Sequence, residues 1–139
     1  MAIDSVFFDT WRPKVLAVLR IVTGYLFLQH GTAKLLGIPF VEAFKAGVPL
    51  MSMGGIAGVL EIVGGVLLLI GLFTRPTAFI LSGEMAFAYF IGHASQGNAL
   101  LPMLNGGELA VTWCFVFLYF AVAGAGAWSV DAVWRRENS

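Results

Sequence analysis

The chain has 139 residues, of which 59% are hydrophobic and 12% charged, and its mean hydropathy is +0.88. Soluble domains carry roughly 45 to 50% apolar residues, so this composition indicates a membrane protein. The formal net charge is zero, and we therefore expect no nucleic-acid partner. Cys114 is the only cysteine, which excludes an internal disulfide, a Cys-x-x-Cys redox pair and a cysteine-rich metal site.

The first predicted span covers residues 15–36, a length that can cross a bilayer. It is too long and too polar for a cleaved signal peptide, so we expect a retained anchor. Residues 1–14 mix aromatic and charged side chains. That mixture fits a segment at the headgroup level and fits an irregular terminus equally well.

Four side chains of this first span are costly in lipid: Arg20, Gln29, His30 and Lys34. Charged residues at membrane depth usually face the bundle interior and find partners there. Helical steps of three and four residues place one stripe on a common face, with His30 at its edge and Gln29 on the opposite side. The stripe consists of Arg20, Gly24, Phe27, Gly31 and Lys34.

Three more spans follow, over residues 55–73, 77–95 and 107–128. We therefore expect an all-α fold, an integral membrane bundle of four transmembrane helices in a single domain over residues 1–139. The second span is rich in glycine, and Gly54 and Gly58 have the small-xxx-small spacing that lets helices approach closely. Glu61 shares their stripe, so we expect it on the close-packing face.

Turn and cap signals lie between and after these spans. Residues 38–53 form the longest connection, and their glycines and prolines predict a loop that is plain, partly re-entrant or amphipathic. Pro76 suits the first turn of the third span. Ser129 and Asp131 suit the cap of a short terminal helix.

The basic residues are divided unevenly between the two sides of the predicted bundle. One side holds Arg12, Lys14, Arg75, Arg135 and Arg136. The other side holds only Lys45 and Lys34. The positive-inside rule therefore predicts that both termini are cytoplasmic, with Trp11, Trp128 and Trp134 as an aromatic belt at that interface.

Each later span contains one glutamate, and depth along the helices predicts a basic partner for each. The predicted pairs are His30 with Glu61, Arg20 with Glu84, and Lys34 with Glu108. The first is the candidate catalytic pair, because imidazole and carboxylate can exchange protons near neutral pH. The second serves as readily as a structural ion pair that fixes packing, and the third fits a pair near the membrane surface.

Several redox chemistries do not fit the sequence. Haem held by two histidines needs them at matching depth, and His30 and His93 differ in depth. No Glu-x-x-His motif of a diiron bundle occurs, nor does a glycine-rich dinucleotide motif after a strand. We expect no metal site and no redox centre in the chain itself.

Four segments nevertheless share their order and spacing with a known group of proteins. They are HGTAKLLG at 30–37, GVLEIVGGVLLLIGLFTRPTA at 58–78, GEMAFAYF at 83–90 and NGGELAVTWCFVFLYFAVAGAGAWSVD at 105–131. In these segments the chain resembles the DoxX family of small bacterial membrane proteins. The family's characteristic positions correspond to His30, Gly31, Lys34, Glu61, Arg75, Glu84 and Glu108.

The resemblance implies a multi-pass protein of the bacterial inner membrane that is linked to quinone chemistry, since family members are associated with thiosulfate:quinone oxidoreductase, quinone stress and membrane redox complexes. We expect a subunit or accessory of an oxidoreductase system that binds ubiquinone or menaquinone. His30 and Lys34 would donate to the quinone and Glu61 would relay protons. Glu108 and Trp113 are further candidates for ligand contacts. Electrons would come from a redox partner protein.

Two other functions remain open at this point. A nonenzymatic scaffold would bind a partner through the loop over residues 38–53. A small-solute or lipid transporter would use the polar cluster as a path. The glycine-rich face of the second span would serve either packing within the bundle or a homo-oligomer.

Overall fold

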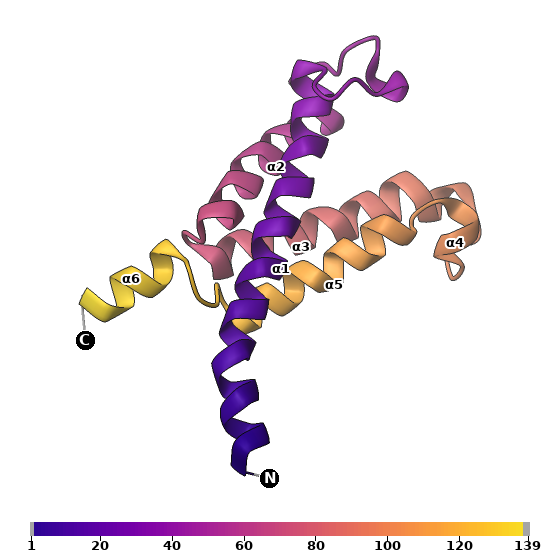
Figure 1. Ribbon diagram of the computed structural model, residues 1–139. Helices are drawn as coiled ribbons and strands as arrows, with labels where there is room; N and C mark the ends of the chain where they lie inside the picture. The colour runs from indigo at the N-terminus through magenta and orange to yellow at the C-terminus, as the bar shows by residue number, and fades with distance from the viewer. Residues whose placement is uncertain (1, 138–139) are drawn as a thin grey trace. The chain divides into compact units, whose positions relative to one another are not determined.

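The computed structural model describes residues 2–137, which contain helices and no strand (Figure 1). Met1, Asn138 and Ser139, which the predicted domain of residues 1–139 includes, lie outside the described residues. The chain divides into two compact units. Unit 1 comprises Met1–Thr74 and Ala125–Ser139, and unit 2 comprises Arg75–Gly124.

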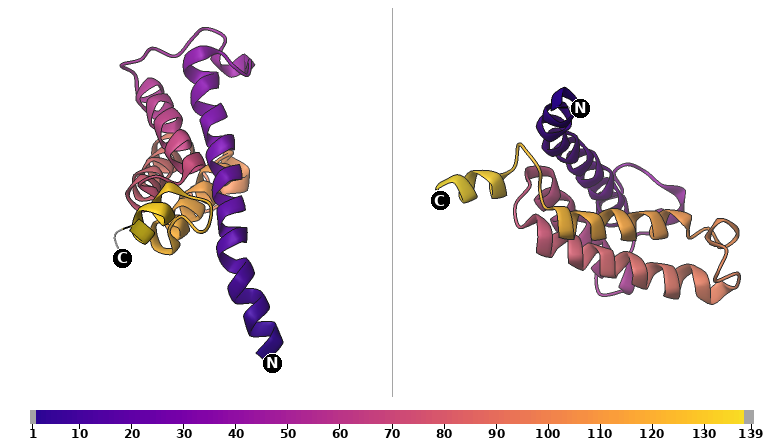
Figure 2. Two further views of the ribbon diagram at one scale, coloured as in Figure 1. Left: turned by 60° about the vertical axis from the view of Figure 1, so that its left-hand side comes forward. Right: turned by 90° about the horizontal axis from the view of Figure 1, so that it is seen from below.

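Unit 1 is built on a pair of antiparallel helices that lie side by side (Figures 1 and 2). Its elements are α1 (Ala2–Leu36), the short 3₁₀ helix η1 (Glu42–Phe44), α2 (Met53–Ile70) and α6 (Val130–Glu137). α1 ends at Leu36, the residue at which the first span was predicted to end. The helix itself begins at Ala2 and includes Pro13, so residues 2–14 continue α1 and do not form an irregular terminus.

Glycines let α1 and α2 approach until their backbones touch. A Cβ atom added at Gly31 would lie 2.6 Å from the carbonyl oxygen of Gly58, and one at Gly24 would lie 2.8 Å from the amide nitrogen of Leu69. From the other side, a Cβ atom at Gly65 would lie 2.8 Å from the amide nitrogen of Leu28. Close backbone contact of this kind is how small residues hold membrane helices together.

The opposite face of α2 is apolar and exposed. Residues spaced by three and four form it: Ile56, Val59, Val63, Val66 and Ile70. The buried face holds Gly55, Gly58, Glu61, Gly64, Gly65 and Leu68. Gly58 and Glu61 lie on it as predicted, whereas Gly54 is only half-buried. An exposed face without polar groups suits lipid rather than water.

Two helices are long and apolar enough to cross a membrane, over Ser5–Leu36 and Met53–Ile70. Together with the exposed apolar face of α2, they agree with a helical membrane protein. By length, α1 spans about 52 Å and α2 about 27 Å at 1.5 Å per residue. The N-terminal part of α1 therefore runs past the end of α2, as Figure 1 shows.

Unit 2 contains a second antiparallel pair of helices, α3 and α5, also side by side (Figure 2). Its elements in order are α3 (Thr74–Phe87), the π-helix η2 (Ala88–His93), the 3₁₀ helix η3 (Ala94–Gln96), α4 (Pro102–Asn105) and α5 (Glu108–Ala123). Pro76 lies in the first turn of α3, as predicted. The predicted fourth span continued to residue 128, whereas α5 ends at Ala123.

The early end of α5 has a local cause. Gly124 and Gly126 have φ angles of 86° and 72°, which an α-helix cannot continue through. The guanidinium of Arg75 donates to the carbonyl oxygens of Ala121 and Val122, which lack helical partners at this end. The glycines and the arginine together terminate the helix.

Candidate functional site

A buried ion pair inside unit 1 joins the last turn of α1 to the middle of α2. Lys34 Nζ lies 2.6 Å from Glu61 Oε1, and the two side chains are 18% and 3% exposed. Two charges buried within membrane helices are costly alone and are retained when they pair. The pair is thus the principal polar feature on the glycine-packed face.

Helix geometry explains why Lys34 reaches Glu61. Gly31 packs against Gly58 and Ile62, the residues that flank Glu61 along α2, so Glu61 lies at the depth of Gly31. Side chains of an α-helix tilt toward its N-terminus, which directs Lys34 back by about one turn. Glu61 lies at the depth predicted for it, but its partner is Lys34, one turn after the predicted partner His30.

The predicted pairing of Glu61 with His30 is therefore not what the structure shows. His30 is half-buried at the edge of the stripe, and its ring centroid lies 6.4 Å from that of Phe27. It makes no hydrogen bond within the part of the chain that the structure describes. It lies one helical turn before Lys34.

The Lys34–Glu61 pair leaves hydrogen-bonding capacity unused. Glu61 Oε2 is buried and has no hydrogen-bond partner among residues 2–137. An ammonium group has three N–H donors, and the contacts of the described residues use one of those on Lys34. The pair therefore combines unused N–H donors on Lys34 with an unused acceptor on Glu61.

Arg20 is fully buried and bonds only to backbone carbonyls within unit 1. Its five acceptors are the carbonyl oxygens of Leu68, Leu69, Ala125, Ala127 and Trp128. A guanidinium has five N–H donors, so each has an acceptor. Leu68 and Leu69 lie in the last turn of α2, where carbonyl oxygens have spare capacity to accept hydrogen bonds. Arg20 therefore fastens α1 to the end of α2 and to residues 125–128.

Asp131 does not cap the terminal helix, as predicted, but the start of α3. Its carboxylate accepts hydrogen bonds from the amides of Phe73 (2.8 Å) and Thr74 (2.9 Å), at the start of α3. Ser129 alone caps the terminal helix, because its hydroxyl accepts from the amide of Ala132 over 3.2 Å. The prediction was right for Ser129 and wrong for Asp131, whose partners lie far away in the sequence.

The remaining predicted site residues belong to unit 2. Glu84 is partly buried on α3, and Glu108 is the exposed first residue of α5. The ring of Trp113 stacks on that of Phe117, with centroids 5.7 Å apart. The pairing of Arg20 with Glu84 and the contacts of Glu108 and Trp113 with a ligand stay predictions.

One polar network in unit 2 was not anticipated. The hydroxyl of Tyr89 donates to the carbonyl of Ala99 over 2.6 Å and accepts from Asn105 Nδ2 over 3.2 Å. His93 Nδ1 lies 3.1 Å from the carbonyl oxygen of Asn105. These bonds attach the residues between η3 and α5 to the π-helix. This structural role of His93 was not predicted from the sequence.

Two membrane-length helices joined through glycine and a buried Lys–Glu pair are consistent with a helical membrane protein. The sequence of the chain matches the family model DoxX over residues 15–94. The chain therefore belongs to the DoxX family, as the resemblance predicted.

Relatives cover nearly the same length. An uncharacterized protein of Haemophilus influenzae is 52% identical over 124 residues, 88% of this chain and 92% of that protein. Inner membrane protein YphA of Escherichia coli is 30% identical, over 89% and 93% of the two chains. "Putative oxidoreductase CatD" of Bacillus subtilis is 26% identical, over 82% of each. No solved structure shows a significant match. The names of the Escherichia coli relatives support a membrane location.

Proposed function

We propose that this protein is a multi-pass subunit of the bacterial inner membrane that binds a quinone and assists an oxidoreductase system. The observation that carries the proposal is the buried Lys34–Glu61 pair, whose carboxylate retains an unpartnered oxygen. The oxidoreductase name of the Bacillus subtilis relative gives further support.

The residues present suit a quinone head. A quinone offers two carbonyl oxygens, and Lys34 and His30 can each donate a hydrogen bond from the same side of α1. When bound, a quinone supplies two-electron chemistry that is coupled to proton uptake. Lys34 would orient the head, and Glu61 would hold a proton on Oε2, close to the lysine that positions the ligand.

The chain depends on a partner for electrons in this proposal. It has a single cysteine and no glycine-rich dinucleotide motif. We therefore assign the electron supply to a redox partner protein, and this chain acts as a quinone-binding subunit rather than a complete enzyme.

The topology that accompanies the proposal has four spans and cytoplasmic termini. α3 and η2 together comprise residues 74–93, and α5 comprises residues 108–123. At 1.5 Å per residue, α3 and η2 together are about 30 Å long, which is the thickness of a bilayer core. The distribution of basic residues and the tryptophans at positions 11, 128 and 134 support the orientation.

Thermal unfolding in detergent with a soluble ubiquinone or menaquinone analogue tests the proposal. A ligand that binds only the native state must raise the melting temperature. We expect a saturable rise in the wild type that is lost in Lys34→Met and Glu61→Gln. Each variant is compared with itself without ligand, so that a change in basal stability does not enter.

Glu42→Gln is the matched control, since Glu42 also pairs with a lysine, Lys45, but on the exposed surface. It should respond to the analogue as the wild type does. No rise in the wild type, or an equal rise in all variants, would contradict a quinone site at the Lys34–Glu61 pair. The first outcome would favour the scaffold alternative.

A further inference from the structure

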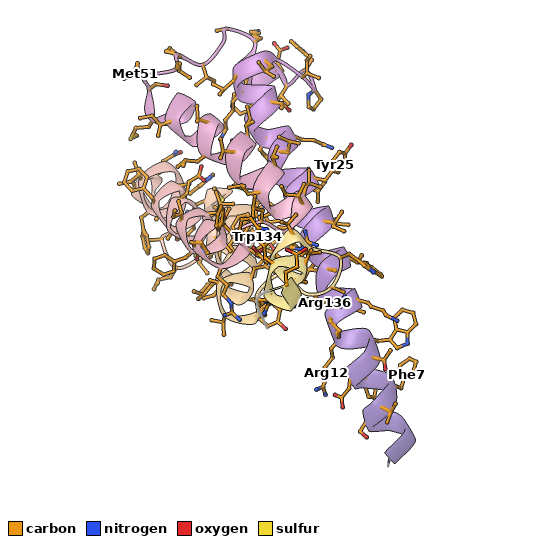
Figure 3. All side chains as sticks on the ribbon, turned by 90° about the vertical axis from the view of Figure 1, so that its left-hand side faces the viewer. Phe7, Arg12, Tyr25, Met51, Trp134 and Arg136 are labelled. Atoms are coloured by element: carbon orange, nitrogen blue, oxygen red, sulfur yellow. The ribbon has the colours of Figure 1, made fainter. Side chains whose placement is uncertain are left out.

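The loop between α1 and α2, residues 37–52, exposes large apolar side chains. Phe40 is 71% exposed and Met51 is 88% exposed, and Ile38 and Leu50 are also exposed. Figure 3 shows Met51 on this loop. Single exposed apolar residues are common on protein surfaces, but several of them close together in one segment indicate an interaction surface.

The charges of the loop do not oppose contact with lipid. Glu42 and Lys45 are the only charged residues between positions 37 and 52. They form an ion pair within η1 and the residue that follows it. The segment therefore carries no net charge.

The loop continues the lipid-facing surface of the two membrane-length helices. Leu36 is exposed at the end of α1, and Met53 and Ile56 are exposed at the start of α2. Both helices are long and apolar enough to cross a membrane. Exposed apolar residues thus occur at the end of α1, on both sides of η1 in the loop, and at the start of α2.

Backbone hydrogen bonding limits how deep the loop can lie. The amides of Phe44, Lys45 and Gly47 bond within the loop. The amides of Phe40, Leu50 and Met51 make no hydrogen bond within the described residues. Unpaired amides are excluded from hydrocarbon, but water and headgroup oxygens satisfy them at the interface. The loop therefore suits the boundary between headgroups and acyl chains.

We infer that residues 37–52 form an interfacial segment, whose partner is the phospholipid bilayer itself. Phe40 and Met51 enter the acyl boundary of the leaflet at this end of α1 and α2, while the Glu42–Lys45 pair faces water. This inference does not depend on quinone binding, because it concerns the surface of the loop and not the Lys34–Glu61 site.

Site-directed spin labelling of the full chain tests the inference. In a Cys114→Ala background, Phe40→Cys and Met51→Cys are labelled with a nitroxide and reconstituted in phosphatidylcholine–phosphatidylglycerol vesicles. The collision rates of each label with oxygen, which partitions into lipid, and with a water-soluble nickel chelate are then compared. Ile56→Cys gives the reference for lipid, and Glu42→Cys gives the reference for water.

We expect the ratio of oxygen to nickel accessibility at positions 40 and 51 to exceed that at position 42 by several-fold and to approach that at position 56. A ratio equal to that at position 42 would place the loop in water and overturn the inference. Labels that are immobilised and shielded from both reagents would overturn it as well, because the loop would then be covered by protein, such as a second copy of the chain.

Discussion

Gly31 of α1 lies against Gly58 of α2 so closely that a Cβ atom on Gly31 would come within 2.6 Å of the Gly58 carbonyl oxygen. This contact places Glu61 at the depth of Gly31, and Lys34, one turn after Gly31, reaches back to form the buried ion pair with it. The glycine contact therefore sets the spacing that the polar site needs. A wider separation of the helices would part the two charges.

Substitution of Gly31 by alanine should destabilise the protein strongly. The added methyl group meets backbone and the Ile62 side chain, so the helices must move apart. Overpacking typically costs about 1 to 3 kcal/mol, and contact with backbone places this variant at the upper end. The melting temperature in detergent should fall clearly below that of the wild type.

Gly83→Ala is the control for that variant. Gly83 lies inside α3 and is exposed, and a Cβ atom there would meet nothing within 4 Å. Alanine in a helix is favoured over glycine by roughly 0.5 to 1 kcal/mol, so the melting temperature should stay level or rise. If both variants melted alike, close packing at Gly31 would not be the cause.

Replacement of Arg20 by lysine should be costly although the charge is kept. Lysine has three donors and no planar fork, so at least two of the five carbonyls lose their bonds. Leaving buried polar groups unsatisfied costs about 1 to 3 kcal/mol each. We expect a loss of at least about 2 kcal/mol in the free energy of unfolding.

Arg12→Lys provides the comparison, since Arg12 is exposed and pairs only with Asp9, three residues earlier. Surface changes of this kind usually stay within about 0.5 kcal/mol. A similar, small effect of both substitutions would show that the carbonyl contacts of Arg20 do not stabilise unit 1.

A double-mutant cycle should reveal strong coupling between Lys34 and Glu61. Removal of one partner from a buried pair costs roughly 3 to 5 kcal/mol, because the other charge remains without compensation. Lys34→Met and Glu61→Leu should each destabilise, and the double variant should recover much of the loss. The cycle is read from melting in detergent.

The same cycle at Glu42 and Lys45 measures an exposed pair of the same composition. Exposed ion pairs contribute about 0 to 1 kcal/mol, so coupling there should be several-fold smaller. Additive effects of Lys34→Met and Glu61→Leu would contradict the buried pair.

Asp131→Ala should loosen the start of α3. Loss of a cap costs about 0.5 to 2 kcal/mol, and the amides of Phe73 and Thr74 lose their acceptor. Hydrogen exchange at these two amides should accelerate. Ser129→Ala should instead accelerate hydrogen exchange at the amide of Ala132, at the start of α6. Faster exchange at Ala132 in Asp131→Ala, or at Phe73 and Thr74 in Ser129→Ala, would contradict these two caps.

The sequence alone determined the class of the protein and the faces of its first two helices. Composition predicted a helical membrane protein. Helical spacing predicted that Gly24, Gly31 and Glu61 lie on packing faces, and all three residues are buried. These predictions succeed because hydrophobicity and the helical period are local properties, set by residues that are close in the chain. The motifs also predicted the DoxX family correctly.

Only the tertiary structure decided which groups meet. The partner of Glu61 depends on how far Lys34 reaches back along its helix, and the partners of Arg20 are backbone carbonyls, which every residue carries and no motif marks. Asp131 reaches amides more than fifty residues away. Pairing across such distances depends on the register between elements and on side-chain length, and neither is written in the spacing of a single helix.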